Sequence, residues 1–316
     1  MLNIVNVTAP FFALVACGFL AARYRLLPDN AVPALNTYVL YFALPCMLFR
    51  FTAATPFEQI FNPQVLFAYT ATGIAILVIF IAAFRFATGK AVHECAYAGL
   101  AVAWSNWGYM GFALIPSLLG PQSLPVIIAA GIGDLLLIVS AGLALAGSGG
   151  SGEGSRFVAV MRGAVLRVAR NPLMWAVIAG TASAAISLSP PVAIDSFVRL
   201  LGVSAGPVAL FAIGVSLYRP GVGVLRGDIM MITGAKLLLH PYLAGLAATY
   251  VFSLSRLETH TLVLIAALPV AGTVYLFAER AGADAEPIAG AILVSTALAF
   301  FSFSALCWAF GVQFGA

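Results

Sequence analysis

Long apolar stretches dominate this chain and constrain its fold more than any other feature. Each stretch is about twenty residues long, which is enough for a helix rising ~1.5 Å per residue to cross a hydrocarbon core ~30 Å thick. The stretches lack the period-2 alternation of membrane β-barrel strands. Only 8% of the residues are charged, against about 25% in soluble domains. The sequence therefore predicts an all-α integral membrane protein.

The apolar pattern predicts ten transmembrane helices. Residues 147–155 between the fifth and the sixth read GSGGSGEGS, which is typical of a flexible connection. The expected spans are residues 5–22, 34–52, 64–86, 95–118, 124–146, 171–187, 197–218, 229–252, 260–279 and 287–310.

The cationic residues indicate how the chain lies in the membrane. With the N-terminus outside, three of the fifteen Lys and Arg residues face outward and Lys236 lies within a span. This bias follows the positive-inside rule, so we expect an inner (plasma) membrane protein with both termini outside. It also accounts for the net charge of +4 without a nucleic-acid partner. The eleven inward-facing cations are Arg23, Arg25, Arg85, Lys90, Arg156, Arg162, Arg167, Arg170, Arg219, Arg226 and Arg280.

A shift of 162 residues aligns the chain with itself at prolines and glycines, which fix backbone geometry. We therefore predict a first five-helix repeat at 1–146, a cytoplasmic linker at 147–170 and a second five-helix repeat at 171–316. An odd number of spans inverts the second repeat, as in many secondary transporters. The matched pairs are Pro10 with Pro172, Gly18 with Gly180, Pro28 with Pro190, Pro45 with Pro207, Gly120 with Gly282 and Pro125 with Pro287.

Two spans carry interruptions at similar places in the two repeats. WSNWGYMGF breaks the fourth span, ALPVAGTVY breaks the ninth, and Trp107 meets Pro269 under the 162-residue shift. Broken membrane helices free backbone groups that can bind a substrate or an ion. We predict that the site lies at these two breaks.

Two ionisable side chains fall near the membrane midplane. Asp134 is about ten residues, or ~15 Å, from one end of the fifth span, and Lys236 is about eight residues, or ~12 Å, from one end of the eighth. They either form a structural salt bridge or act in coupling, with Lys236 attracting an anion and Asp134 changing its protonation. His240 lies one turn beyond Lys236, where it either relays a proton or makes a structural hydrogen bond.

The motifs of enzymes and metal sites are missing from the sequence. The four cysteines and three histidines are scattered, and neither a GxSxG nor an HExxH motif occurs. The Gly-rich GSGGSGEG lacks the Lys-Ser/Thr ending of a phosphate loop. We therefore predict no catalytic residues, no metal site and no cofactor.

Several segments, taken in order, resemble the auxin efflux carrier family, which belongs to the bile/arsenite/riboflavin transporter superfamily. The resemblance covers nearly the whole chain. In the fourth span Asn106, Met110 and Gly111 match the family motif, while Ala113 stands where a proline is expected. The segments are YVLYFALPCMLF, SNWGYMGF, NPLMWAVIAG, LGVSAGPVALFAIGVSL, KLLLHPYL, ALPVAGTVYLFAERAG and VSTALAFF.

The resemblance implies a fold like that of sodium/proton antiporters, in which the broken helices 4 and 9 cross. Helices 1, 2, 6 and 7 would form a scaffold, and helices 3–5 and 8–10 a mobile transport domain. The resemblance leaves open a homodimer through the scaffold. We expect Pro45 and Pro207 to bend two equivalent scaffold helices beside the site.

We expect a secondary transporter that moves a small organic anion, such as a carboxylate, by an elevator-like motion. Coupling to protons or sodium ions stays open, with Asp134, Lys236 and His240 as the coupling residues. The alternatives are a cation/proton antiporter and a membrane sensor that binds a ligand without moving it. The expected substrate-binding residues are Asn106, Trp107, Met110, Pro269, Gly272, Thr273 and Lys236.

Overall fold

A computed structural model describes residues 2–28, 30–55, 62–146, 166, 170, 172–186, 190–218 and 226–311. Apart from one isolated β-bridge, the regular structure of these residues is helical. The all-α prediction is therefore confirmed for the described part of the chain. The predicted linker at 147–170, except residues 166 and 170, lies outside the described residues, as do residues 219–225.

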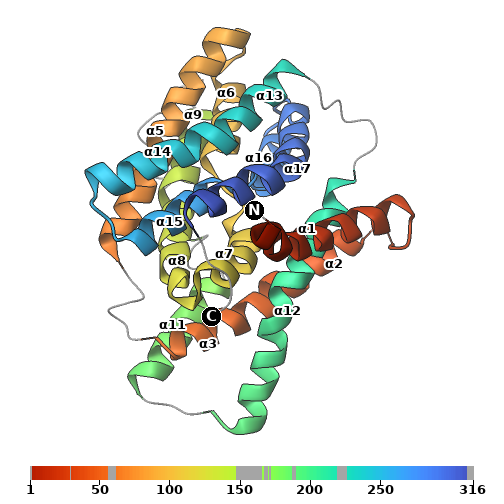
Figure 1. Ribbon diagram of the computed structural model, residues 1–316. Coiled ribbons are helices and arrows are strands. Elements are labelled where there is room, and N and C mark those ends of the chain that lie inside the picture. The colour runs from red at the N-terminus through yellow and green to blue at the C-terminus, as the bar shows by residue number, and fades with distance from the viewer. Residues whose placement is uncertain are drawn as a thin grey trace.

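The first half of the chain forms helical runs that match the first five predicted spans (Figure 1). η1, η2 and η4 are single π-helical turns, and η3 is a 3-10 turn. The runs are α1 (Leu2–Arg23); α2 (Ala31–Tyr38), η1 (Val39–Ala43) and α3 (Leu44–Ala53); α5 (Pro63–Thr88); α6 (Val92–Ala103), η2 (Trp107–Gly111) and α7 (Phe112–Leu119); and η3 (Pro121–Ser123), α8 (Leu124–Gly133), η4 (Asp134–Ile138) and α9 (Val139–Ala146).

The second half also forms five helical runs, of which the fourth is broken, as in the first half, while the π-helical turns fall in different runs. Its helix ends, like those of the first half, lie within five residues of the predicted ones. The runs are α11 (Pro172–Ala185); α12 (Val192–Leu217); α13 (Gly227–Gly234), η5 (Ala235–Leu239), α14 (His240–Leu246) and η6 (Ala247–Val251); α15 (Arg256–Ala266) and α16 (Thr273–Arg280); and α17 (Glu286–Ala309).

Six helical runs in the described residues are long and apolar enough to cross a membrane. Three further apolar helices are shorter, Ala9–Arg23, Trp107–Leu119 and Pro172–Ala185. The chain thus has the composition of a multi-pass membrane protein, and the count of ten spans stays a prediction. The six longer runs are Ala31–Ala53, Pro63–Thr88, Pro121–Ala146, Val192–Leu217, Gly227–Val251 and Glu286–Ala309.

Local signals in the sequence explain where several helices begin and end. The side chain of Asn62 accepts a hydrogen bond from the N–H of Gln64 at 2.9 Å, which caps the start of α5. Gly89 ends α5 in the left-handed conformation with φ 67°. Ser255 and Glu258 form a reciprocal capping box at the start of α15.

The helices pack as two groups (Figure 1). The smaller group contains α1, α2, α3, α11 and α12, with α1 packed on α12, and α3 packed on both α11 and α12. The larger group contains α5 to α9 and α13 to α17, including the pairs α5 with α6, α14 with α15, and α13 with α17. The smaller group lies along the bottom and the right of Figure 1, and the larger group fills the upper left.

Gly18 and Gly180 allow close helix contacts at two matching places in the smaller group. A Cβ on Gly18 would collide with the carbonyl oxygen of Phe211 in α12, and a Cβ on Gly180 would collide with that of Phe49 in α3. The 162-residue shift relates these two contacts, so α1 packs on α12 as α11 packs on α3. Only glycine permits this approach, because any other residue would place a carbon on the neighbouring backbone.

Pro45 and Pro207 both lie within uninterrupted helical runs. Pro45 is in the first turn of α3, directly after the π-helical turn η1, and Pro207 is inside α12. Because proline lacks an N–H, it leaves one carbonyl of the preceding turn without its usual partner. The bending of the two helices at these prolines stays a prediction.

Candidate functional site

Two helical runs of the larger group are interrupted where the sequence predicts breaks. α6 gives way at Trp104, which is extended with φ −96° and ψ 113°, and helix resumes at Trp107. α15 ends at Ala266, and α16 begins at Thr273. Pro269 lies in this second gap, where its ring and its missing N–H oppose a continuous helix.

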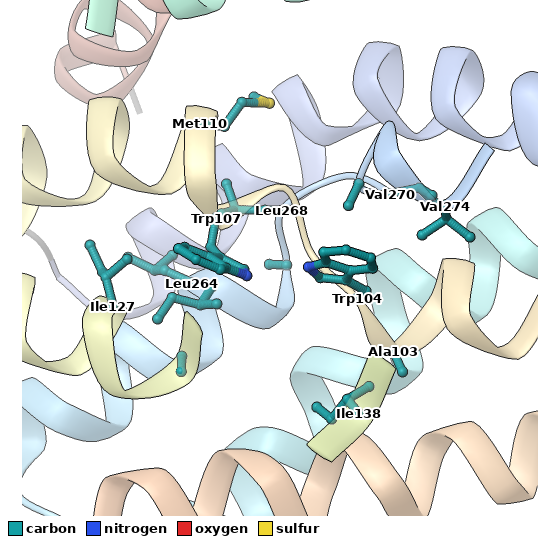
Figure 2. Packing of buried hydrophobic residues seen from close by; sticks show 14 of the residues in the cluster. Ala103, Trp104, Trp107, Met110, Ile127, Ile138, Leu264, Leu268, Val270 and Val274 are labelled. Carbon is teal, nitrogen blue, oxygen red and sulfur yellow. The ribbon is translucent and has the colours of Figure 1, made fainter. Parts of the chain in front are cut away.

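The two gaps meet as a short antiparallel pair of extended segments. The N–H of Asn106 donates to the carbonyl of Pro269 at 3.0 Å, and the N–H of Ala271 donates to the carbonyl of Trp104 at 3.2 Å. These bonds satisfy backbone groups that a membrane interior would leave unpaired. We call residues 104–106 and 267–272 the helix crossing; Figure 2 shows Trp104 and Trp107 on its two sides.

The contacts at the helix crossing bring Ser105 opposite Val270, Asn106 to Pro269 and Ala271 to Trp104. In an antiparallel pair the sequence separation of facing residues changes at every step, so these contacts do not define one sequence shift. The equivalence of Trp107 and Pro269 under the 162-residue shift stays a prediction.

A cavity of about 240 Å³ opens beside the helix crossing, between the two helix groups. Asn106 and Val270 of the crossing line it, together with Gly272 and Thr273 at the start of α16. Other lining residues come from α2, η2, α12 and α17. The volume is just below the ~300–1,000 Å³ of pockets for drug-sized ligands. The cavity therefore suits a smaller organic molecule.

The polar side chains of this cavity are neutral hydrogen-bonding groups. Asn36, Asn106, Tyr109 and Thr273 line it, and their side chains have no hydrogen-bond partner in the described part of the chain. The described lining residues include no Lys, Arg, His, Asp or Glu. The site can therefore hydrogen-bond a polar ligand, but it offers no ionised side chain to that ligand.

The structure separates the predicted binding residues into those that line the cavity and those that do not. Asn106, Gly272 and Thr273 line it. Pro269 does not, although its carbonyl holds the crossing together. Its direct contact with a ligand stays a prediction.

Trp107 and Met110 are both buried, and Figure 2 shows their side chains pointing away from each other. Trp107 is 5% exposed and Met110 is 1% exposed, and neither lines the cavity. The indole of Trp107 packs over Gly131 of α8, where an added Cβ would strike the ring. Figure 2 shows both side chains near the crossing, with Trp107 beside Ile127 and Leu264. Their role in binding stays a prediction.

Lys236 is fully buried against the end of α6, on the π-helical turn η5. Its Nζ donates to the carbonyl of Val102 at 3.1 Å and to the hydroxyl of Ser105 at 2.6 Å. The third contact is with Nδ1 of His240 at 3.1 Å. An ammonium has three donors, so these three acceptors use all of them. Lys236 therefore holds the C-terminal end of a broken helix, where a cation is favourable.

Asp134 is also fully buried, on the π-helical turn η4, but it has different partners. Its Oδ2 accepts a hydrogen bond from the hydroxyl of Tyr69 at 3.3 Å. Within the described residues no ion pair joins it to Lys236, whose donors are occupied by other groups. The direct salt bridge considered from the sequence is thus not formed in this structure.

Three buried polar atoms near these charges form no hydrogen bond of ordinary geometry among the described residues, namely Asp134 Oδ1, His240 Nε2 and Trp107 Nε1, although the indole N–H of Trp107 acts on the Asp134 carboxylate. Because His240 Nδ1 accepts from Lys236, its Nε2 is the nitrogen that carries hydrogen in the neutral ring. Buried groups of this kind are normally satisfied by water, an ion or a moving proton. The sequence indicated Asp134, Lys236 and His240 as buried ionisable groups and Ser105 as part of the break in the fourth span, but Tyr69 carried no comparable signal.

A family model described as "Membrane transport protein" matches residues 3–307. The chain belongs to the auxin efflux carrier family. This confirms the resemblance seen in the sequence. The match extends over the helix crossing, the cavity and both helix groups.

Curated relatives span most of this carrier's length. A protein of Rhizobium meliloti named "Putative malonate transporter" is 31% identical over 309 residues, covering 98% of this chain and 96% of the relative. "Uncharacterized transporter YfdV" of Escherichia coli is 26% identical, with 86% of each chain covered. The "Lysosomal cholesterol signaling protein" of Mus musculus is 24% identical over 90% of this chain but 35% of its own length. The family and the names of the first two relatives mark a membrane transporter.

Ala113 departs from the proline that the family resemblance implies, yet this carrier forms the helix crossing without it. α7 runs from Phe112 through Ala113 and contains Pro116. Ala113 packs against Gly206 of α12, where an added Cβ would lie 3.2 Å from the Cβ of Ala113. This contact joins the two helix groups through small apolar surfaces.

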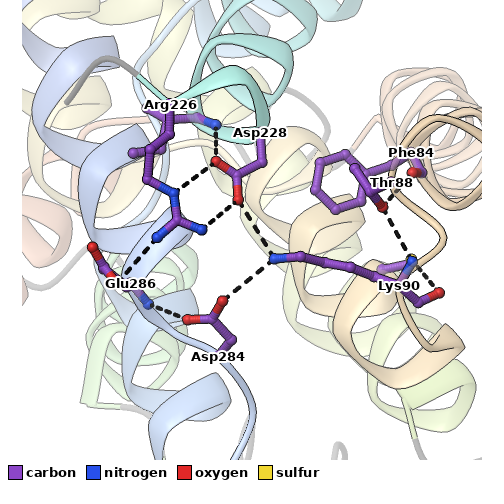
Figure 3. Close-up of polar contacts among 9 residues, drawn as sticks. Phe84, Thr88, Lys90, Arg226, Asp228, Asp284 and Glu286 are labelled. Carbon is purple, nitrogen blue, oxygen red and sulfur yellow. Dashed lines mark hydrogen bonds and ion pairs between the residues drawn. The ribbon is translucent and has the colours of Figure 1, made fainter. Parts of the chain in front are cut away.

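Ion pairs tie together one end of the larger group (Figure 3). Lys90 reaches Asp228 at 3.4 Å and Asp284 at 3.3 Å, while Arg226 reaches Asp228 at 2.9 Å and Glu286 at 3.1 Å. We call these five residues the ion-pair cluster. They link the α5–α6 connection, the start of α13 and the α16–α17 connection. The cluster therefore holds segments from both halves of the chain in one unit.

The smaller group has its own polar links. Arg50 of α3 pairs with Asp195 of α12 at 3.1 Å, and Tyr38 of α2 shares a 2.7 Å hydrogen bond with Ser204 of α12. Like the ion-pair cluster, these links lie within one helix group.

A second cavity, of about 460 Å³, lies away from the helix crossing. Its walls include Phe51, Asn62, Gln122 and Glu258. The carboxylate of Glu258 already accepts from Asn62 at 2.6 Å and from the N–H of Ser255 at 2.9 Å. Because this carboxylate is already paired, the cavity at the crossing is the better candidate for the ligand site.

Within the described ranges no three His, Cys, Asp or Glu side chains are placed to share a metal ion.

Proposed function

We propose that this carrier is a secondary active transporter of a small organic anion, most simply a carboxylate. The observation that carries the proposal is the cavity beside the helix crossing, lined by Asn106 and by the start of α16. Family membership supports transport, and the name of the Rhizobium relative supports an acid as the substrate. Anion binding is the chemistry that helix starts and neutral donors favour.

Two helix starts would receive the carboxylate. The helical run from Trp107 to Leu119 and helix α16 from Thr273 both begin at the crossing. Their first N–H groups lack partners within their own helices, and the helix dipole adds partial positive charge there. Asn106, Tyr109 and Thr273 supply side-chain donors around the same space. Lys236 would support this site indirectly, by holding the end of α6.

We infer the ten-span inverted architecture, with the smaller group as scaffold and the larger group as transport domain. The matched contacts of Gly18 and Gly180 support equivalent halves. The ion pairs given above each lie within one group. Contacts between the groups include the small pair Ala113 and Gly206 and the apolar rings of Phe12 and Phe300, 5.0 Å apart. Such surfaces can slide with little loss of polar bonding, which favours an elevator-like motion.

The sidedness of the cavity follows from the charge bias. The positive-inside rule places Arg23, Lys90 and Arg226 at the cytoplasmic face. The cavity lies between the crossing and this face, because its walls include the start of α2, the end of α12 and the start of α17. The structure then corresponds to an inward-facing carrier, with the Ala113–Gly206 contact closing the outer side.

Proton coupling through Asp134 is part of the proposal. Its Oδ1 is buried and forms no hydrogen bond of ordinary geometry, and a carboxylate in that position is a natural proton acceptor. His240 Nε2 lies in the same interior and would serve as a relay. Uptake driven by an imposed pH gradient, measured with and without sodium, separates proton coupling from sodium coupling.

A thermal-shift screen of the purified protein tests the substrate class. The panel contains mono- and dicarboxylates across pH, with amino acids and sugars as comparison ligands. Binding to the folded state stabilises it by mass action, by about 2.7 kcal/mol at a ligand concentration of one hundred times Kd. The melting temperature therefore rises. The proposal predicts a concentration-dependent rise with at least one carboxylate. Stabilisation by none of the acids would contradict it.

A sensor that binds without transporting is the second candidate, because one relative is named a signaling protein. The matched region is only about a third of that relative. Both candidates predict binding in the thermal-shift screen. Only the transporter predicts movement of the bound acid into sealed vesicles.

A further inference from the structure

The charged side chains around the cavity limit which ligands it can bind. Its described walls carry no ionised side chain. The two charges buried in the larger group, Lys236 and Asp134, are 0% exposed and do not line the cavity. The three donors of Lys236 are already used by Val102, Ser105 and His240. A bound anion must therefore be compensated by dipoles and neutral donors.

The helix N-termini at the crossing can compensate about one negative charge on a bound ligand. Each helix N-terminus acts like about half a positive charge, and two of them meet at the crossing, so together they offset about one anionic group. Asn106, Tyr109 and Thr273 add hydrogen bonds without adding charge. This arrangement suits one carboxylate placed beside the crossing.

The remaining cavity surface is mostly apolar. Val32, Ile213, Leu276 and Ile292 form much of it, and Asn36 is the neutral polar group on α2. A second carboxylate there would lose its hydration and gain no cation, which is the costly case for a buried charge. A protonated carboxyl is neutral, and the amide of Asn36 can both donate to it and accept from it.

We infer that the transported species carries a single negative charge, so that a dicarboxylic acid such as malonate passes in its singly protonated form. This inference rests on the proposed function and narrows it to monoanions with a small apolar body. A proton then enters with each dicarboxylate on the substrate itself, without a titrating side chain in the cavity.

The test uses the full chain in proteoliposomes and two matched probes. Labelled malonate is offered at external pH values on both sides of its second pKa, and its apparent KM is measured. Malonamate, the monoamide, is the competitor; it has nearly the same size and keeps one charge throughout this range. Because the singly protonated fraction falls, the apparent KM for total malonate should rise roughly tenfold per pH unit above that pKa. The inhibition constant of malonamate should stay nearly constant.

Other outcomes separate this inference from the proposed function. An apparent KM for total malonate that stays level or falls as the dianion becomes dominant would overturn the monoanion inference while leaving anion transport intact. A parallel rise for malonamate would also overturn it, because the pH effect would then belong to the protein. If the protein neither binds nor takes up any acid at any pH, both the monoanion inference and the proposed function are overturned.

A single substitution tests whether a cationic side chain outside the described residues pairs with a second carboxylate of the ligand. Arg219 follows Tyr218, just after the end of α12, and lies outside the described residues. Arg219→Gln should change the apparent KM for malonate and the inhibition constant of malonamate by the same factor. A selective loss of malonate binding, with malonamate still competing, would show that Arg219 pairs with a second carboxylate and would overturn the inference.

Discussion

Lys236 donates a hydrogen bond of 2.6 Å to the hydroxyl of Ser105, one residue beyond the extended Trp104 that ends α6. The same ammonium reaches the carbonyl of Val102, so a side chain from the eighth predicted span holds the break in the fourth. Its position explains how a charged lysine is tolerated inside the larger group. It acts on the backbone of the crossing and does not line the cavity.

Lys236→Met should therefore weaken both folding and transport. The change keeps most of the side-chain volume but leaves the acceptors of Val102 and Ser105 buried and unpaired, at about 1–3 kcal/mol each. We expect a lower melting temperature in detergent and a drop in maximal uptake rate. Lys90→Met, in the partly exposed ion-pair cluster, is the control and should cost less stability. Equal melting temperatures for Lys236→Met and the parent protein would contradict this role.

Asn106→Asp tests whether the cavity receives an anion. The substitution keeps the side-chain shape but replaces a donor amide with a group that is an anion when ionised. Loss of one charge-assisted hydrogen bond, about 1.5–3 kcal/mol, together with repulsion should raise the apparent KM for any transported acid. Asn106→Ser, which keeps a donor, should raise it less. If the aspartate variant transports acids as well as the parent protein does, Asn106 does not contact the anion.

Gly18→Ala and Gly180→Ala should each destabilise the smaller helix group. In both cases the new methyl group would press on a backbone carbonyl of the facing helix, so the helices must separate. Gly234→Ala is the matched control, because a Cβ there meets nothing within 4 Å. The control should be neutral or stabilising by about 0.5–1 kcal/mol, since alanine favours helix. The melting temperatures of the three variants are compared with that of the parent protein. An unchanged melting temperature for Gly18→Ala or Gly180→Ala would refute the close helix contact at that glycine.

Composition and periodicity were sufficient to predict the helices and both breaks. Apolar length set the helix ranges, and Pro269 with the polar residues around Asn106 indicated where helix could not continue. The 162-residue shift located Gly18 and Gly180 at matching helix contacts, but it did not name the residues that meet at the crossing, where Ser105 lies opposite Val270. A sequence shift relates equivalent positions and carries no information about which residues touch.

The candidate site was only partly predictable, because side-chain direction depends on packing between distant helices. Asn106 and Thr273 line the cavity as expected, while Trp107 is turned over Gly131 into the core. Two of the three acceptors around Lys236 could not be foreseen, since Val102 and Ser105 lie far from it in sequence, whereas His240 lies one helical turn away. Tyr109 lines the cavity but resembles an ordinary membrane aromatic in the sequence.

A cysteine pair at Ala113 and Gly206 should lock the two helix groups together. The added Cβ at Gly206 would lie 3.2 Å from that of Ala113, slightly closer than the ~3.5–4.5 Å of a disulfide, so a small adjustment suffices. In a background lacking Cys17, Cys46, Cys95 and Cys307, oxidation should abolish uptake, and reduction should restore it. The single-cysteine variants should be unaffected by oxidation. Full uptake by the cross-linked pair would rule out sliding of α7 past α12.

The most direct test of the central claim is counterflow of labelled malonate in proteoliposomes that contain the full chain. Unlabelled malonate is loaded inside, and entry of the label is followed over time. The account predicts transient, saturable accumulation of label that is strongly reduced in Asn106→Asp and absent in the oxidised cysteine pair. If a carboxylate stabilises the protein in the thermal-shift screen, yet no acid of the panel enters beyond the level of protein-free liposomes, the chain binds anions without carrying them and the account is wrong.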